Sequence, residues 1–242
     1  MRCANEKWKE IFVLNDLSFE TLNEDIPITI VKNVLKYPEQ VREFFDNGYW
    51  WGNDYDESCS RPGKSFEFGQ NVDVYFDPLV QDLMEFYEAE DILPIEIYGN
   101  CFNGNMNLYN VRSALPHVDT FPGDDQNEDP RMDVAFNLNL TKSDKVKTAF
   151  YSFNNKRSVC DFHKNDYEDL RTCWDRQKDI RKEKTWFLID DEYENYKLEY
   201  IADIEYNSMI LYPSHNWHNS YIKEDWFNDE DRITFTGFFE IV

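Results

Sequence analysis

One histidine of the four in the sequence, His117, lies two residues before a carboxylate, Asp119. In an extended segment, side chains two residues apart point to the same face, so these two would project together while Val118 turns away. An imidazole and a carboxylate at that spacing can bind one metal ion. A histidine beside an aspartate is more often an ordinary hydrogen-bonded pair, so the triplet alone is a weak metal signal.

Two later segments add residues of matching chemistry. SMILYPSHNWHNSYI joins an apolar strand to two histidines, His215 and His218, and DRITFTGFFEIV would place Arg232, Thr234 and Thr236 on one face of a strand. An arginine on a face available for burial needs an anionic partner, which a carboxylate would satisfy with two hydrogen bonds. Seen singly, these are more often surface or core residues, but their occurrence together favours a metal site with a neighbouring carboxylate site.

The order of these motifs resembles the 2-oxoglutarate and iron(II)-dependent oxygenases, especially the prolyl-hydroxylase-like branch. LYPSHNWH is similar to that branch's apolar strand, Pro-Ser and later histidine, which favours His218 over His215 as a ligand. IVKNVLKYPEQVREFFDNGYW followed by SRPGKS is similar to the opening of phage-encoded and marine bacterial members. The resemblance covers most of residues 27 to 242. KVKT replaces the family's Gly-Gly-Thr motif, and a charged insertion runs from about residue 154 to 184.

The resemblance implies a non-haem iron(II) centre held by His117, Asp119 and His218. Two histidines and one carboxylate on one octahedral face leave three positions open, an arrangement associated with iron(II) oxygenases. 2-Oxoglutarate would take two of these positions and dioxygen the third. The implied reaction is a 2-oxoglutarate-dependent dioxygenase reaction, in which decarboxylation of the oxoacid is coupled to hydroxylation of a substrate that the sequence does not identify.

The resemblance also implies how the cosubstrate is anchored. The distal carboxylate of 2-oxoglutarate would reach the guanidinium of Arg232 and the hydroxyl of Thr234. Tyr109, on the segment before His117, would donate a further hydrogen bond.

The elements that position these residues are expected to be mainly β, in an α+β arrangement. From about Ile95 onward, short alternating or aromatic runs are separated by turn residues, which indicates strands. Helical spacing is found after Pro38 and from Pro78 to Glu90. We expect a single oxygenase domain over residues 1–242: a mixed helical support region over about 1–94, and a double-stranded β-helix (jelly-roll) core over about 95–242 with the charged insertion near 154–184.

The composition restricts the partners. A formal net charge of -23 disfavours bulk nucleic acid, because nonspecific binding to phosphates rests on Lys and Arg. Five cysteines without CxxC spacing indicate reduced thiols, and the charged amino terminus and short apolar runs predict a cytoplasmic protein that does not bind membranes. A small-molecule or peptide substrate is expected, the likeness to phage proteins is consistent with a virus-encoded chain, and the oligomeric state stays open.

Two alternatives remain at this point. The missing Gly-Gly-Thr motif and the charged insertion would also suit a jelly-roll binding module without catalysis. A cupin-type metalloenzyme that does not use 2-oxoglutarate would keep the metal ligands but leave Arg232 unexplained.

Overall fold

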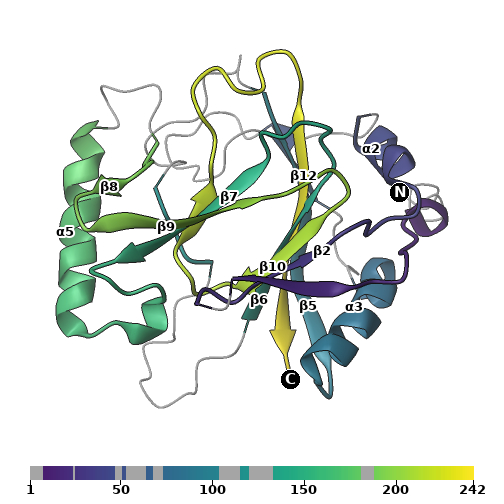
Figure 1. The fold of residues 1–242 in the computed structure, drawn as a ribbon, viewed down its shortest axis with the longest axis horizontal. Coiled ribbons are helices and arrows are strands. Elements are labelled where there is room, and N and C mark those ends of the chain that lie inside the picture. Colours follow the sequence, from purple (N-terminus) through teal and green to yellow (C-terminus); the bar gives the residue numbers. More distant parts are fainter. Residues whose placement is uncertain are drawn as a thin grey trace.

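Two antiparallel sheets form the centre of the structure, a computed structural model that describes residues 8–23, 25–46, 51–52, 64–67, 73–103, 115–119, 133–180 and 188–242. The larger sheet has the spatial order β1 (Phe19–Asn23), β2 (Ile28–Val31), β10 (Met209–Pro213), β6 (Asp133–Asn139), β12 (Arg232–Ile241), β5 (Ile92–Phe102), β4 (Lys64–Glu67) and β3 (Trp51–Gly52). The smaller sheet has the order β11 (His218–Ser220), β7 (Lys147–Phe153), β9 (Tyr196–Asp203) and β8 (Glu192–Tyr193). Figure 1 shows both sheets with helices at either side of the molecule.

Strand β12 is central to the larger sheet because it pairs antiparallel with β5 on one side and β6 on the other. Side chains alternate along it, so Thr234, Thr236 and Phe238 face the smaller sheet, whereas Phe235 and Phe239 face away from it. Both sets are buried. A strand covered on both faces explains why the sequence RITFTGFF is almost continuously apolar or small.

Two helices, α2 (Pro38–Asp46) and α3 (Asp73–Tyr87), cover the outer face of the larger sheet, at the right of Figure 1. Their apolar side chains, including Phe45 and Phe76, join Trp8 and Phe235 in one aromatic cluster. The helix expected after Pro38 begins at that residue, as the fixed φ of proline favours in a first turn. The second helix begins at Asp73, five residues before the expected start at Pro78, and ends at Tyr87.

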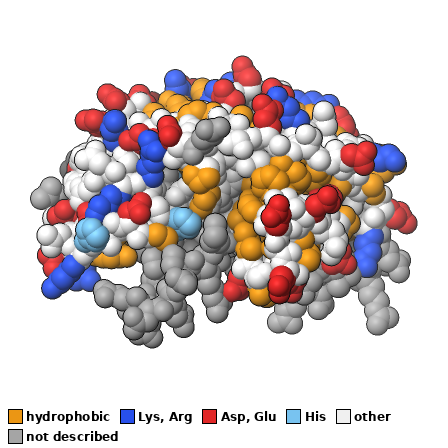
Figure 2. Space-filling model, turned by 60° about the horizontal axis from the view of Figure 1, so that its bottom comes forward, with side chains coloured by type: hydrophobic (Ala, Val, Ile, Leu, Met, Phe, Trp, Pro, Cys, Tyr) orange, Lys and Arg blue, Asp and Glu red, His pale blue; other side chains and the backbone are white. Residues whose placement is uncertain are grey.

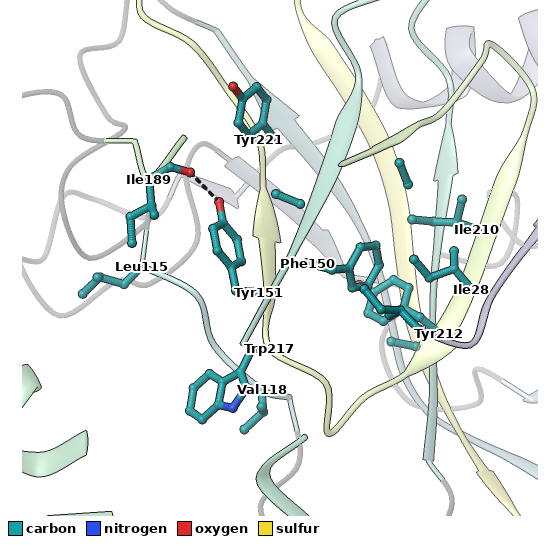
Figure 3. Packing of buried hydrophobic residues seen from close by; sticks show 14 of the residues in the cluster. Ile28, Leu115, Val118, Phe150, Tyr151, Ile189, Ile210, Tyr212, Trp217 and Tyr221 are labelled. Carbon is teal, nitrogen blue, oxygen red and sulfur yellow. Dashed lines mark hydrogen bonds between the residues drawn. The ribbon is translucent and has the colours of Figure 1, made fainter. Parts of the chain in front are cut away.

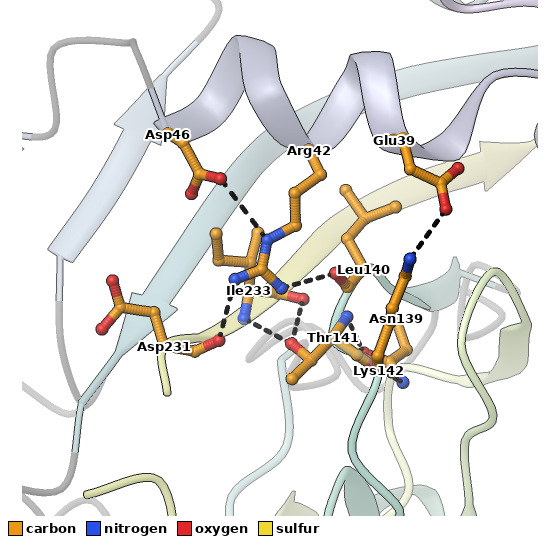
Figure 4. A network of polar contacts seen from close by, with 9 residues as sticks. All are labelled: Glu39, Arg42, Asp46, Asn139, Leu140, Thr141, Lys142, Asp231 and Ile233. Atoms are coloured by element: carbon orange, nitrogen blue, oxygen red, sulfur yellow. Dashed lines mark hydrogen bonds and ion pairs between the residues drawn. The ribbon is translucent and has the colours of Figure 1, made fainter. Parts of the chain in front are cut away.

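A polar network, drawn in Figure 4, connects helix α2 to the segments that follow β6 and precede β12. Arg42 donates one hydrogen bond to the carbonyl of Leu140 (2.7 Å) and another to the carbonyl of Asp231 (3.3 Å), while its Nε lies 3.6 Å from the carboxylate of Asp46. These carbonyls follow β6 and precede β12. The network therefore fixes the helix over the end of the larger sheet where β12 begins with Arg232.

A second apolar cluster packs between parts of the two sheets and beneath α5, and Figure 3 shows some of its residues. Phe150 of β7 meets Tyr212 of β10 edge to face, with ring centroids 5.1 Å apart. The buried hydroxyl of Tyr151 donates to the carbonyl of Ile189 at 3.0 Å, so its polar end is satisfied inside the cluster.

The described part of the charged insertion, residues 154–180, lies against the smaller sheet. It contains a short 3-10 helix, η2 (Val159–Asp161), and the helix α5 (Lys164–Ile180), which lies beside β8 and β9 at the left of Figure 1. Phe162 packs on Trp217 with ring centroids 5.5 Å apart, and Leu170 and Cys173 of α5 are buried in the same cluster. The insertion thus contributes apolar side chains to the core as well as charge to the surface.

The described surface is charged, and acidic and basic side chains are interspersed on the face drawn in Figure 2. Among the helices that the structure describes, none is long and apolar enough to cross a membrane. The fold is mainly antiparallel β with a few helices, as the sequence predicts.

Candidate metal and carboxylate site

The segment of residues 115–119 lies against the start of β11, which brings His117 and Asp119 to His218. The backbones of His117 and His218 exchange two hydrogen bonds of 2.9 Å, each N–H donating to the other's carbonyl. The N–H of Asp119 donates to the carbonyl of Ser214, also at 2.9 Å. A short antiparallel bridge therefore places residues a hundred positions apart on one face.

The three side chains converge on one point. One oxygen of Asp119 lies 3.7 Å from Nε2 of His117, the other lies 3.2 Å from Nε2 of His218, and the candidate ligand atoms all lie within 4.8 Å of one another. The side chain of His218 is 6% exposed, whereas that of His117 is 47% exposed. The cluster is therefore anchored in the core on one side and accessible from solvent on the other.

His218 is oriented by a backbone carbonyl. Its Nδ1 lies 2.9 Å from the carbonyl oxygen of Asn216, which holds a proton on Nδ1 and turns Nε2 toward Asp119. Burial acts to lower the pKa of His218, but the Asp119 carboxylate and the Asn216 carbonyl outweigh burial and raise that pKa above its usual value. The site thus attracts a cation to Nε2, and a metal ion can take the place of a proton there.

The cluster opens into a cavity of about 290 Å³ between the two sheets. Most of its lining can form hydrogen bonds, and permanent charge among the described lining residues is confined to Asp119 and Arg232. The lining residues are Tyr98, Asn100, His117, Val118, Asp119, Asn137, Thr148, Tyr212, His218, Asn219, Ser220, Arg232, Thr234, Thr236 and Phe238.

Arg232 marks one end of this cavity. It is 3% exposed at the start of β12, and its guanidinium lies 3.5 Å from the hydroxyl of Thr234 and 3.4 Å from that of Ser220. Ser220 is the strand partner of Thr148 across β11 and β7, so the Thr148 hydroxyl lies on the same wall. That hydroxyl is buried and forms no hydrogen bond within the described part of the chain. A guanidinium among hydroxyls is suited to a carboxylate ligand.

A second wall of the cavity consists of neutral polar residues on the larger sheet. Thr236 is the strand partner of Tyr98 in β5 and of Asn137 in β6, and its hydroxyl accepts a hydrogen bond of 3.2 Å from Asn100. Tyr212 completes this wall. Its burial, with smaller contributions from Asp119 and Tyr98, raises its pKa well above the usual value, so the phenol stays protonated.

The structure brings six residues singled out in the sequence around this one cavity: His117, Asp119, His218, Arg232, Thr234 and Thr236. Tyr109 lies outside the described residues. The backbone carbonyl of His215 accepts from the N–H of Val159, away from the cavity lining.

Several lining residues were missed in the sequence. Ser220 lies two positions after His218, so strand alternation could have placed it on the same face. Thr148 and Asn137 carry no such signal, because their position depends on the pairing register of strands distant in sequence.

No protein-family model and no curated protein matches the sequence. Among solved structures, the fold is similar to that of HygX from Streptomyces hygroscopicus with nickel and 2-oxoglutarate bound. The TM-score is 0.53 at 10% sequence identity, covering 90% of this chain and 84% of that chain. HygX with nickel, 2-oxoglutarate and hygromycin B bound gives a TM-score of 0.50 at 10% identity, with the same coverage. At this identity the likeness establishes a shared fold.

Proposed function

We propose that this chain is a non-haem iron(II) oxygenase that couples the decarboxylation of 2-oxoglutarate to the hydroxylation of a substrate. We further propose that the two sheets form a double-stranded β-helix, or jelly roll, of the prolyl-hydroxylase-like branch. One observation carries the proposal: a His-Asp-His cluster and a buried arginine lie at one cavity. A His-Asp-His cluster alone could bind several kinds of metal ion, but Arg232 adds a residue that can bind the carboxylate of a cosubstrate.

The donor set fits iron(II). Two imidazole nitrogens and one carboxylate oxygen would occupy one face of the metal and leave positions for other ligands. The Asn216 carbonyl would keep His218 in the tautomer that presents Nε2, and Asp119 would balance part of the metal's charge. Iron with its oxoacid and dioxygen would supply the redox chemistry, and the protein would supply position and exclusion of water.

The opposite end of the cavity fits the distal carboxylate of 2-oxoglutarate. Arg232 would bind that carboxylate with two hydrogen bonds, and the hydroxyls of Thr234, Ser220 and Thr148 would supply further donors. A shared fold with HygX, which was solved with 2-oxoglutarate bound, supports this assignment. Tyr109 stays a predicted additional donor.

The test of the proposal is formation of succinate. Protein loaded with iron(II) without oxygen and then exposed to it should form succinate only when 2-oxoglutarate is present. Asp119→Ala should lower the rate at least about a hundredfold because it removes a metal ligand. Asp144→Ala, at an exposed position outside the cavity lining, is the matched control. An Asp119→Ala protein that forms succinate as fast as wild type would refute the proposal.

A second variant separates the alternatives. Arg232→Met should weaken 2-oxoglutarate binding about a hundredfold or more, since it leaves a buried carboxylate without its charged partner. Unchanged activity and cosubstrate affinity in this variant would favour a metalloenzyme that does not use the oxoacid. A wild-type protein that binds neither iron nor 2-oxoglutarate at micromolar concentration would instead be a binding module.

A further inference from the structure

We propose that the wall formed by Tyr98, Thr236 and Asn137 recognises the substrate, and that the substrate presents neutral hydroxyl or amide groups to this wall. This inference rests on the proposed function, because it assigns Asp119 to the metal and Arg232 to the cosubstrate. It goes further by naming the chemical class of the molecule that is oxidised.

The charges of the cavity support a neutral substrate. Once Asp119 holds the metal and Arg232 holds the cosubstrate, no permanent charge remains among the described lining residues to pair with an ionic group of a second ligand. Burying a carboxylate or an ammonium group without a counter-charge costs several kcal/mol. A hydroxyl or an amide needs only hydrogen-bond partners, which this wall supplies.

The position of the wall separates it from the carboxylate end. Thr236 lies four residues after Arg232 in β12, which corresponds to about 13 Å along an extended strand. 2-Oxoglutarate has polar groups at its two ends and two methylene groups between them. Arg232 would hold the distal carboxylate at the far end of β12 from Thr236, and the two methylene groups form no hydrogen bonds with the wall. We therefore assign the wall to the other ligand.

Asn137 shows that the wall needs a ligand. Asn137 is 7% exposed, and its side-chain oxygen is buried and accepts no hydrogen bond from any residue that the structure describes. An unpaired buried acceptor costs about 1–3 kcal/mol. Thr236 beside it accepts from Asn100 and keeps its own hydroxyl proton to donate. The pair thus offers both donors and acceptors, which matches a hydroxyl-bearing molecule.

The test compares probes that share a skeleton and differ in charge. Glucose, glucosamine and glucuronate form one set, and ethylene glycol, ethanolamine and glycolate form a smaller set. Each is titrated into protein loaded with nickel(II) and 2-oxoglutarate, at a pH where the amines are protonated and in about 0.15 M salt, which screens nonspecific attraction to the acidic surface. In at least one set, the neutral member should bind at least tenfold more tightly than both charged members.

Two matched variants assign the effect to the wall. Asn137→Leu, which keeps the volume but removes the amide, should weaken the neutral probe at least tenfold and change 2-oxoglutarate affinity less than threefold. Thr234→Val should show the opposite split, because Thr234 lies at the carboxylate end.

Three results would overturn this inference: the absence of a tenfold preference for the neutral member in both sets, no binding by any probe, or an Asn137→Leu protein whose main defect is in 2-oxoglutarate binding. Failure of wild-type protein to bind 2-oxoglutarate at all would instead remove the proposed function. The two failures are therefore distinguishable.

Discussion

Gly237 lies at the most crowded point of the larger sheet, and its replacement by alanine gives a sharp test of the packing. Gly237 pairs with Ile97 in β5 and with Phe136 in β6, on the face that α2 and α3 cover. A Cβ atom added there would lie 2.3 Å from Cε1 of Phe136 and 2.8 Å from Cγ1 of Ile97. Both distances are far below the contact distance of about 3.5–4.0 Å between carbon atoms, so the ring or the strands must move.

The expected cost follows from two opposing effects. Overpacking a tight core costs about 1–3 kcal/mol, whereas replacing glycine by alanine restricts the unfolded chain and returns about 0.4–1 kcal/mol. The 2.3 Å contact puts Gly237→Ala at the upper end of the overpacking range, so we expect a net loss of about 2 kcal/mol, or about 4–8 °C in Tm for a chain of this length. Gly99→Ala should cost less. A Cβ atom added at Gly99 would lie 2.8 Å from the ring of Phe45, and the helix that carries Phe45 can shift more easily than a central strand.

Thermal and urea unfolding followed by circular dichroism would measure these losses. Phe136→Leu removes the atoms that clash, so Gly237→Ala should cost at least about 1 kcal/mol less in that background than in wild type. The reasoning fails if Gly237→Ala unfolds within about 0.5 kcal/mol of wild type, or if the two substitutions are additive. Metal binding should persist below the melting temperature, because Thr236 and Phe238 face the cavity on the opposite side of the sheet.

Three further predictions follow from polar contacts. The carboxylate of Asp166 accepts from the N–H of His163 and pairs with Lys156; these contacts outweigh burial and lower its pKa below 3.8. These contacts therefore stabilise the fold fully above the ordinary pKa of an aspartate, and their contribution is lost as the pH falls through the lowered pKa. The Tm advantage of wild type over Asp166→Asn should shrink in acid, and an advantage that grows in acid would contradict this. Asn139→Ala should cost about 2–4 kcal/mol in urea unfolding, since its fully buried amide forms three hydrogen bonds, and a loss below about 1 kcal/mol would show that the network is dispensable. Arg42→Met should cost about 1 kcal/mol by the same measurement, because it loses two hydrogen bonds to carbonyls but keeps an apolar stem. An unchanged stability would mean that hydrogen bonds from water to the two carbonyls replace those of Arg42 at no cost.

The strands were readable from the sequence wherever local patterning carried the information. Alternation and β-branched or aromatic residues marked β6, β7, β10 and β12, and proline marked the start of α2. The helical spacing from Pro78 to Glu90 predicts a later start for α3 than the one observed at Asp73, and Pro78 lies inside that helix. The role of the insertion was also hidden, since its few apolar residues show their purpose only when Phe162 and Leu170 meet the smaller sheet.

The sequence by itself determined the chemistry of the candidate site, because two-residue spacing in an extended chain fixes which side chains share a face. His117 with Asp119, and Arg232 with Thr234, follow from that rule alone. The tertiary structure decided the rest. Strand register and the bridge between His117 and His218 are long-range pairings, and such pairings bring His117 to His218 and Asn137 into the cavity. No local pattern encodes them, since they depend on how the two sheets pack around one core.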